Sequence, residues 1–412
     1  MNARKMKDSG IEWIGETPEE WIVCKIKYLA TMKSGESIGA SEIANDGQYP
    51  VYGGNGLRGY TSAYTHDGKY ILIGRQGALC GNVRSVEGKF WATEHAVVVY
   101  EYDNIDIHWF KYSLDAMNLN QYSTSAAQPG LSVEQITNIL ACVPPFSEQK
   151  AIAGYLDEKC AAIDQVVASK QKQNEQLAEY RQSLITEAVT KGLNPSVPMK
   201  NSGIEWIGEI PEEWQVLPLK YLLKYPLQYG ATETGEDYVD GYPRYIRITD
   251  IDSNNKLKEE NQRYLNFKDA SPFILNDGDI LFARSGATVG KTFLYLSEYG
   301  KAAFAGYLVR ASVNTDVAFS KFIYYYTFSY CYEYWKNMIF SQATIQNIGA
   351  DKYSIIDVPQ PPLAEQKAIA AYLDKKCGDI DALRERNKKI IDSLQEYKQS
   401  LIYEAVTGKI EL

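Results

Sequence analysis

The sequence predicts an α+β chain with pseudo-two-fold internal symmetry, in which two α/β domains are separated by two long antiparallel helices that form a coiled coil. The first observation behind this prediction is a repeated frame. Residues 6–21 and 199–214 are identical at 14 of 16 positions, and residues 144–164 and 361–381 at 15 of 21. The second is that the long segments between these copies share little sequence. One scaffold therefore presents two unlike inserts.

The repeats divide the 412-residue chain into five parts. A chain of this length is large enough for two to four domains, each with its own core. In chain order we expect an N-terminal repeat motif at 1–21, a first insert at 22–143, a central repeat region at 144–214, a second insert at 215–360 and a C-terminal repeat region at 361–412.

Two long helices are the clearest structural prediction. The first is expected at about 147–191, with Ser147 as its N-cap and Gly192 at its end, and the second at about 364–407. Apolar residues follow a heptad-like spacing, which predicts that the two helices pair. The expected seam consists of Leu156, Cys160, Ile163, Val167, Leu177, Leu184 and Ala188, with polar Lys170, Asn174 and Arg181 between them, and of Leu373, Cys377, Ile380, Ile391, Leu394, Leu401 and Ala405. The polar members either fix the register or lie off the seam.

Both inserts are predicted to combine strands with a helical stretch. The aromatic-rich segments 106–119 and 319–340 are expected to be helical, and the charges of Lys321, Glu333 and Lys336 favour a core helix over a membrane span for the second. Runs rich in β-forming residues and broken by glycine occur at 49–62, 69–74, 94–100, 244–251, 278–284 and 305–312.

A short match links the two inserts: ILIGRQGALCGNV at 71–83 and ILFARSGATVGKT at 280–292. Arg75 and Arg284 each follow a β-rich run and precede two glycines. Glycine allows a tight turn and a close approach of the backbone to a ligand. An arginine at such a turn can pair with guanine or contact phosphate. The alternative is a strand–turn–strand whose surface arginine pairs with a carboxylate.

The composition is that of an ordinary globular protein, with a formal net charge of −9 and 32 tyrosines. This acidic charge argues against a protein that binds nucleic acid on its own through electrostatic attraction, because such proteins usually carry a basic surface. The first insert carries 9 Lys+Arg against 11 Asp+Glu and the second 15 against 16, so the inserts are nearly neutral. The six cysteines show no CxxC spacing, and no signal peptide is evident, which favours a cytoplasmic protein.

Three catalytic interpretations fail on chemistry. Tyr52–Gly56 resembles a methyltransferase cofactor loop, but the following residues favour β structure or a turn instead of a helix. Segment 143–146 resembles the Asn-Pro-Pro-aromatic site of amino methyltransferases, but valine replaces the asparagine. Glu87 and Lys89, with Asp67, could form a nuclease triplet, although the other half offers no counterpart. We therefore expect no catalytic site and no metal site in this chain.

The repeated tryptophans are candidates for packing or for partner docking. Trp13 and Trp21 lie in the first copy of the motif, and Trp206 and Trp214 in the second. A large indole ring suits either role, because it buries a large apolar surface and carries one N–H donor.

Three motifs present in both halves carry a family resemblance. They are SGIEWIGE-x-PEEW, PP-x-x-EQKAIA-x-YLD-x-K, and a long helix that ends SLI-x-EAVTG or SLI-x-EAVTKG. Together they frame the whole chain and resemble the specificity subunit of type I restriction–modification systems.

The resemblance implies that 22–143 and 215–360 are target-recognition domains 1 and 2, each of which reads half of a bipartite site on double-stranded DNA. It also implies that the paired helices act as the spacer. Two modification subunits would bind the frame and methylate adenine with S-adenosylmethionine, and two restriction subunits that use ATP and Mg²⁺ can join them. The specificity subunit itself would be non-catalytic and would hold no cofactor. The alternatives are a stand-alone sequence-specific DNA-binding protein and a coiled-coil scaffold unrelated to DNA.

The family motifs do not fix which insert residues touch bases. Arginine, asparagine and glutamine are the side chains best suited to bidentate base contacts. On this ground the candidate DNA-binding residues are Asn55, Arg58, Arg75 and Gln76 in the first insert, and Arg247, Arg284, Ser285 and Lys291 in the second.

Overall fold

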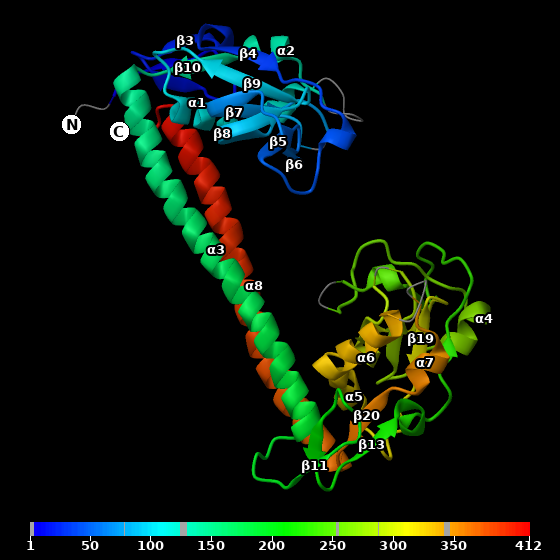
Figure 1. The fold of residues 1–412 in the computed structure, drawn as a ribbon. Helices are drawn as coiled ribbons and strands as arrows, with labels where there is room; N and C mark the ends of the chain where they lie inside the picture. The colour runs from blue at the N-terminus through cyan, green and yellow to red at the C-terminus, as the bar shows by residue number, and fades with distance from the viewer. Residues whose placement is uncertain (1–3, 78, 124–129, 253–254, 287, 342–346) are drawn as a thin grey trace. The chain divides into compact units, whose positions relative to one another are not determined.

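The computed structural model divides the chain into two compact units (Figure 1). Unit 1 contains Met1–Gln171 and Lys388–Leu412, and unit 2 contains Lys172–Asn387. Each unit thus combines one insert, one tryptophan motif and part of both long helices. The structure describes residues 4–77, 79–123, 130–252, 255–286, 288–341 and 347–412.

Unit 1 is built on a six-stranded sheet with the order β4-β9-β7-β8-β5-β6. β5 and β8 pair in parallel, and the other neighbours are antiparallel. The strands are β4 Ala30–Ser34, β5 Tyr49–Gly53, β6 Gly56–Thr61, β7 His66–Gly74, β8 Val83–Ala92 and β9 Ala96–Glu101. Two small antiparallel pairs join the frame to the insert: β1 Met6–Asp8 with β2 Glu16–Pro18, and β3 Ile22–Lys25 with β10 Leu140–Val143.

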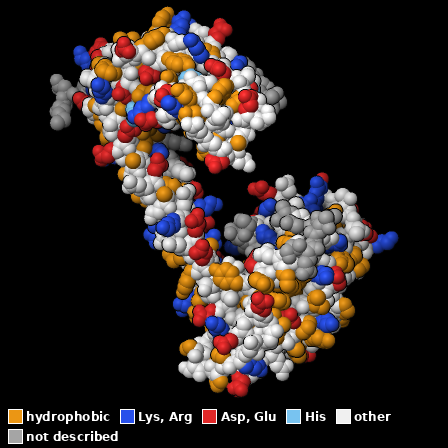
Figure 2. Space-filling view, in the orientation of Figure 1, with side chains coloured by type: hydrophobic (Ala, Val, Ile, Leu, Met, Phe, Trp, Pro, Cys, Tyr) orange, Lys and Arg blue, Asp and Glu red, His pale blue; other side chains and the backbone are white. Residues whose placement is uncertain are grey.

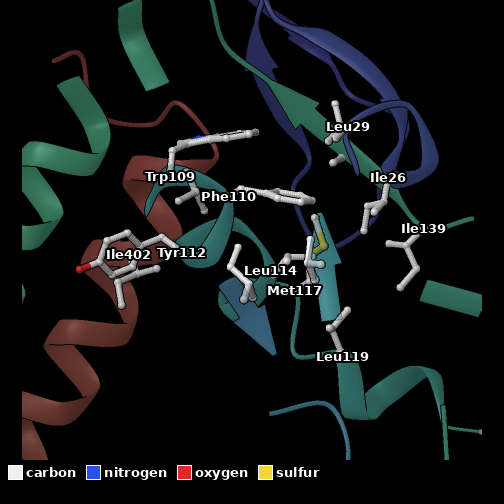
Figure 3. Packing of buried hydrophobic residues seen from close by; sticks show 14 of the residues in the cluster. Ile26, Leu29, Trp109, Phe110, Tyr112, Leu114, Met117, Leu119, Ile139 and Ile402 are labelled. Atoms are coloured by element: carbon white, nitrogen blue, oxygen red, sulfur yellow. The ribbon is translucent and has the colours of Figure 1, made fainter. Parts of the chain in front are cut away.

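The core of unit 1 follows from the alternation of side chains along these strands. Ile71 and Ile73 point to one face of the sheet, whereas Leu72 points to the other, as the two-residue period of a strand requires. Helix α1 (Ile107–Ala116) packs against β7 and β8, while α2 (Val133–Thr137) is a short helix nearby. In Figure 3, Trp109 and Phe110 of α1 lie with nearly parallel rings, whose centroids are 6.1 Å apart. Each fully buried side chain of this kind contributes about 1.5–3 kcal/mol.

Unit 2 repeats the central arrangement with fewer strands. A four-stranded antiparallel sheet has the order β14-β19-β16-β17, which parallels β4-β9-β7-β8. The strands are β14 Gln228–Tyr229, β16 Ile280–Ala283, β17 Thr292–Leu294 and β19 Leu308–Ala311, with a parallel pair of β15 Arg244–Ile246 and β18 Ala302–Phe304. The frame pairs recur as β11 Met199–Asn201 with β12 Glu209–Pro211, and β13 Gln215–Pro218 with β20 Asp357–Gln360.

The aromatic stretch 319–340 is two helices and not the single helix expected. α5 (Ser320–Tyr326) ends at Thr327, whose hydroxyl bonds back to the carbonyl of Tyr324. Ser329 then accepts a bond from the N–H of Tyr332 near the start of α6 (Tyr330–Ser341). Hydroxyl side chains that satisfy free backbone groups interrupt the helix here. The remaining short helices are α4 (Phe267–Ala270) and α7 (Ala350–Ser354).

The two long helices are α3 (Phe146–Lys191) and α8 (Leu363–Val406). α3 begins one residue earlier than expected, so Ser147 lies inside its first turn and does not cap it. The carbonyl of Pro145 accepts the first helical bonds from Glu148 and Gln149. Because the two prolines preceding α3 have fixed φ angles, they set the chain direction without a side-chain cap. Gly192 follows with a φ of +75°, a conformation that favours glycine at a helix end.

Within each unit α3 and α8 run antiparallel. In unit 1, Lys398 forms an ion pair with Asp164 at 2.7 Å, and in unit 2, Arg181 forms one with Asp381 at 3.3 Å. Many predicted seam residues are buried: Leu156, Cys160, Ile163 and Ala188 on α3, and Leu373, Cys377, Ile380, Leu401 and Ala405 on α8. The predicted α+β fold with two α/β domains and two long paired helices is confirmed.

A polar contact lies in this seam in unit 2. Asn387 is only 6% exposed. Its side-chain amide donates to Asn174 Oδ1 at 3.0 Å and to Gln173 Oε1 at 3.1 Å. Of the two interpretations left open for Asn174, the structure places it against the facing helix and not away from the seam.

Candidate nucleic-acid interface

The two arginine loops have the same backbone geometry. The N–H of Arg75 donates to the carbonyl of His95 at 2.9 Å, and that of Arg284 donates to Tyr307 at 3.0 Å. The carbonyl of each arginine also accepts a hydrogen bond from a later segment. The N–H of Leu131 donates to Arg75 at 2.9 Å, and the N–H of Ile348 donates to Arg284 at 2.8 Å. Two inserts with little sequence likeness thus each place an arginine at the corresponding point of their own sheet.

Glycines make these turns possible. Gly81 and Gly290 have φ of +87° and +83°, and each donates its N–H back across the turn at 2.8 Å. A Cβ on Gly81 would lie 2.5 Å from the backbone nitrogen of Asn120, so both space and conformation require glycine there. The glycines therefore form the tight turn that the sequence predicted, and the arginine before each turn is half-buried.

Each arginine side chain rests on the first strand of its sheet. Arg75 Nη1 donates to Ser34 Oγ at 3.2 Å. The guanidinium carbon of Arg284 lies 4.7 Å from the centroid of the Tyr229 ring. Both loops are strand–turn–strand connections, as the alternative expected. Neither arginine forms an ion pair with a carboxylate among the described residues, so that part of the alternative is wrong.

The other candidates in unit 1 lie close to this loop. Asn55 is exposed in the β5–β6 hairpin, and its side-chain oxygen is 3.5 Å from where a Cβ of Gly77 would be. Arg58 is exposed on β6, and Gln76 is exposed beside Arg75. Arg84 of β8 covers Gly56 in the same hairpin. Arg84 was absent from the sequence candidates because it follows the repeated loop and has no marked motif of its own.

The other candidates in unit 2 are largely engaged within the protein. Arg247 donates two bonds to Asp250, at 3.1 and 2.7 Å, and a third to the carbonyl of Asn261 at 2.8 Å. Its hydrogen bond with Asp250 raises the pKa of Arg247. Lys291 donates to the carbonyl of Asp252, and burial lowers the pKa of Lys291. These two cations are thus less available to an external ligand than Arg284.

A concavity of about 820 Å³ lies beside Arg284. Arg247, Arg263 and Tyr307 are among its other lining residues. The side chain of Tyr307 is 66% exposed, and its backbone carbonyl accepts the hydrogen bond from the N–H of Arg284. The sequence drew attention to tyrosine only through its abundance, so neither Tyr307 nor Tyr229 was singled out. Ser285 pairs with Asn347 through its backbone.

The tryptophan motif docks onto the start of a long helix in both units. Trp21 donates its indole N–H to Glu148 at 3.0 Å, and Trp214 donates to Glu365 at 3.0 Å. Both rings are essentially buried, at 0% and 1% exposure. Arg4 adds two further bonds to Glu148 in unit 1. Trp21 and Trp214 therefore pack within the frame.

Trp13 and Trp206 are half-buried and have different neighbours. Trp13 lies 6.2 Å from Tyr403 of α8, whereas Trp206 stacks on Tyr334 of α6 at 5.8 Å. The same motif thus contacts the helix end in one unit and the insert in the other.

The repeated Glu-Gln pair also ties each insert to its long helix. Gln149 accepts from the N–H of Asp106, at the start of α1, at 2.8 Å. Gln366 accepts in the same way from Phe319, at the start of α5, at 2.8 Å. Both glutamines are buried. A buried amide with such partners explains why this residue type recurs in both copies.

A second link joins a tyrosine to a carboxylate. Tyr112 Oη donates to Asp157 at 2.9 Å, and Tyr325 Oη donates to Asp374 at 2.8 Å. Burial, together with these hydrogen bonds, raises the pKa of both tyrosines. Tyr112 and Ile402 of α8 belong to the same hydrophobic cluster (Figure 3).

The residues of the three catalytic interpretations lie at ordinary positions of the fold. Asp67 and Lys89 face each other across β7 and β8, as do Lys69 and Glu87, and these pairs approach to 4.0 and 3.6 Å. Tyr52–Gly56 lies in the β5–β6 hairpin and does not lead into a helix. Across the described residues, His, Cys, Asp and Glu form no group of three or more that could hold a metal ion.

The surface carries charges of both signs. Figure 2 shows acidic and basic side chains intermixed with apolar ones over each unit on the face in view. In the part of the chain that the structure describes, no helix has the length and hydropathy to cross a bilayer.

Comparison with known families matches both halves of the chain. The family described as "Type I restriction modification DNA specificity domain" matches residues 18–178 and again 211–393. The chain belongs to this family, and the resemblance inferred from the repeated motifs is confirmed. It is a DNA specificity subunit of a type I restriction–modification system, the non-catalytic component.

Individual relatives agree with this assignment. The type I restriction enzyme EcoBI specificity subunit of Escherichia coli is 22% identical over 440 aligned residues, covering 99% of this chain and 90% of the relative. The MjaVIII specificity subunit of Methanocaldococcus jannaschii is 25% identical and covers 96% and 94%. The EcoprrI specificity subunit of Escherichia coli is 48% identical, but only over 32% of this chain and 33% of the relative.

A solved structure supports the fold. It is described as "Structural basis underlying complex assembly and conformational transition of the type I R-M system", and it aligns with a TM-score of 0.70 over 96% of this chain and 99% of the other. At 15% sequence identity this likeness concerns the fold alone.

Proposed function

We propose that segments 22–143 and 215–360 are target-recognition domains, and that each reads one half of a bipartite site on double-stranded DNA. Within each domain the arginine loop at the end of β7 or β16 approaches the bases. The remaining candidates, Asn55, Arg58, Gln76, Arg247, Ser285 and Lys291, would supply further contacts to bases or phosphates.

The observation that carries this proposal is the duplicated loop. Arg75 and Arg284 have equivalent backbone bonds although the inserts around them differ. A loop kept in the same geometry inside unlike inserts is expected where both domains perform the same kind of recognition on different sequences.

The frame is proposed to dock two modification subunits, one for each unit. The repeated motif exposes the same glutamates in both copies, such as Glu12 and Glu205 or Glu16 and Glu209. Two equal surfaces suit two equal partners. The modification subunits would methylate adenine with S-adenosylmethionine, and two restriction subunits would use ATP and Mg²⁺. All six cysteines are free thiols, which a reducing cytoplasm maintains.

Exchange of inserts tests this proposal. Segment 22–143 is replaced by the corresponding insert of a relative, and adenine methylation is mapped across the genome of a host that also expresses the modification subunit. We expect one half of the methylated site to change and the other half to stay the same. The reciprocal exchange of 215–360 should change only the other half. A methylation pattern unaffected by both exchanges would contradict the two-domain proposal.

A further inference from the structure

The guanidinium of Arg284 is held in place before any ligand is bound. It lies over the ring of Tyr229, with 4.7 Å between the guanidinium carbon and the ring centroid. The ring is itself anchored, because Tyr229 Oη accepts from the N–H of Ala350 at 2.9 Å. The backbone of Arg284 is fixed on both sides, by Tyr307 and by Ile348. A side chain restrained in this way loses little conformational entropy on binding.

In unit 1 the corresponding arginine is also held in place, but by a different kind of contact. Arg75 is held by a hydrogen bond to Ser34. Ser34 pairs with Val97 in the sheet of unit 1, as Tyr229 pairs with Val309 in the sheet of unit 2, so the two holders occupy corresponding positions. The arginine recurs, whereas the residue that holds it differs between the units.

Arg284 also keeps its charge unpaired. Three arginines line the concavity of unit 2. Arg247 is bound to Asp250, and Arg263 is paired with Asp237. Among the described residues, no ion pair joins Arg284 to a carboxylate, and its Nε is buried without a hydrogen-bond partner, so only the two Nη groups can face a ligand. Of the three arginines that line this concavity, Arg284 is therefore the one whose guanidinium is held in position without being paired with a carboxylate.

We propose that Arg284 reads the O6 and N7 edge of a guanine in the half-site contacted by unit 2, and that Tyr229 is the positioning residue that holds the fork. The inference rests on the proposed function of this unit. The planar guanidinium matches the two acceptors of guanine in the major groove, which no other base presents in that pattern. A phosphate could also bind a guanidinium, so the test must separate the two.

The experiment uses the chain together with its modification subunit, after insert exchange has assigned one half-site to unit 2. Duplexes are compared in which each guanine of that half-site is replaced in turn by 7-deazaguanine, which lacks the N7 acceptor. At one position, binding by the wild-type complex should weaken about 10- to 100-fold. The Arg284→Ala complex should bind the modified and unmodified duplexes equally, because alanine has no donor for the guanine edge. Discrimination in the half-site of unit 1 serves as the internal control and should not change.

Variants of Tyr229 test the positioning role. Tyr229→Phe keeps the ring under the guanidinium, and Tyr229→Leu removes it. We expect the phenylalanine variant to retain most of the guanine discrimination, and the leucine variant to lose about three- to tenfold at that one position. A merely structural defect would instead lower affinity for all duplexes and impair both half-sites together.

Two results would overturn the inference. Equal weakening by Arg284→Ala on every sequence would assign the residue to phosphate contact. A wild-type complex insensitive to 7-deazaguanine at all positions would exclude the guanine edge. Both results leave the half-site itself in place, whereas failure of the proposed function would show as a wild-type complex with no sequence preference in that half.

Discussion

Two buried tryptophans depend on a single carboxylate each. Trp214 is 1% exposed, and its indole N–H has Glu365 as its acceptor at 3.0 Å. The sequence marked the tryptophan by its repetition as a candidate for packing or for partner docking, but it could not identify Glu365 as its partner. The two residues lie 151 positions apart, and only the fold brings them together.

Glu365→Ala should lower the free energy of unfolding by about 1–3 kcal/mol, because it leaves a buried donor without a partner. Glu365→Gln keeps an acceptor oxygen and should lose less. Thermal or urea unfolding of both variants measures the difference. An alanine variant as stable as the glutamine variant would show that water replaces the carboxylate at this site.

Tyr325 makes a contribution to the stability of the folded protein that depends on pH. Burial, together with the bond to Asp374, raises its pKa above the ordinary value of about 10. The folded state therefore favours the neutral phenol, and the resulting stability is complete below pH of about 10 and declines above it as the unfolded chain ionises.

The Tyr325→Phe variant should be less stable than the wild type by about 1–2 kcal/mol at pH 7, because one hydrogen bond to a carboxylate is lost. The gap should narrow above pH of about 10. Urea unfolding of both proteins at pH 7 and at alkaline pH checks this. A gap that widens with pH would mean that the phenol is stabilised in its ionised form.

At the scale of single residues, the candidate site was predictable only where the chain repeats itself. Arg75 and Arg284 stood out because both follow a β-rich run and precede glycines. Ser34 and Tyr229, which hold them, lie on another strand and have unlike chemistry, so no pattern marks them. Arg247 was a reasonable candidate by type, but its bonds to Asp250 show how a neighbour three residues away can occupy a guanidinium.

At the scale of elements, the helix pair contains a polar contact within a seam whose buried residues are mostly apolar. The amides of Asn387 and Asn174 bond across it at 3.0 Å. A buried asparagine pair stabilises one register over others, because a shifted register would leave both amides without partners.

Asn387→Leu alone should destabilise the protein by about 1–3 kcal/mol, since Asn174 Oδ1 and Gln173 Oε1 lose their shared donor. The double variant Asn174→Leu with Asn387→Leu should recover this loss but specify the register less strictly. Thermal unfolding measures the first effect, and disulfide cross-linking between cysteines placed at 181 and 381 measures the second. A double variant that cross-links as cleanly as one retaining both asparagines would assign register to the apolar seam residues instead.

The long helices were predictable because their pattern extends over many turns without proline. The strands were predictable where β-branched residues cluster, as in β7 and β9. β8 (Val83–Ala92) was missed because charged residues and Gly88 interrupt its pattern. The break between α5 and α6 was missed because aromatic residues continue through it, while hydroxyl groups of Thr327 and Ser329 end one helix and begin the next.

At the scale of the whole molecule, a net charge of −9 opposes unassisted binding to DNA. Affinity for a duplex depends strongly on the number of phosphates that cations neutralise. Several cations near the candidate site are already paired with carboxylates, as Arg247 and Arg263 are. We therefore expect the modification subunits proposed as partners to supply positive charge around the DNA.

The isolated chain should bind its site no more tightly than about 10⁻⁶ M at physiological salt, which is the range of non-specific binding. Addition of the modification subunit should produce tight, sequence-specific binding. Fluorescence anisotropy with specific and scrambled duplexes, across a range of salt concentrations, measures both. Tight specific binding by the chain alone would favour the stand-alone DNA-binding alternative.

The same contacts join the insert and the tryptophan motif to a long helix in both units, and this has a consequence for recombination between related genes. Glu148 and Glu365 are separated by the same number of residues as Asp157 and Asp374, and as Thr190 and Thr407. Each of these carboxylates has the same type of partner in its own unit. A genetic crossover between two related genes within the helix segments would preserve every one of these bonds while joining a different insert to the frame. New DNA preferences can thus arise in one step, without compensating mutations elsewhere in the chain.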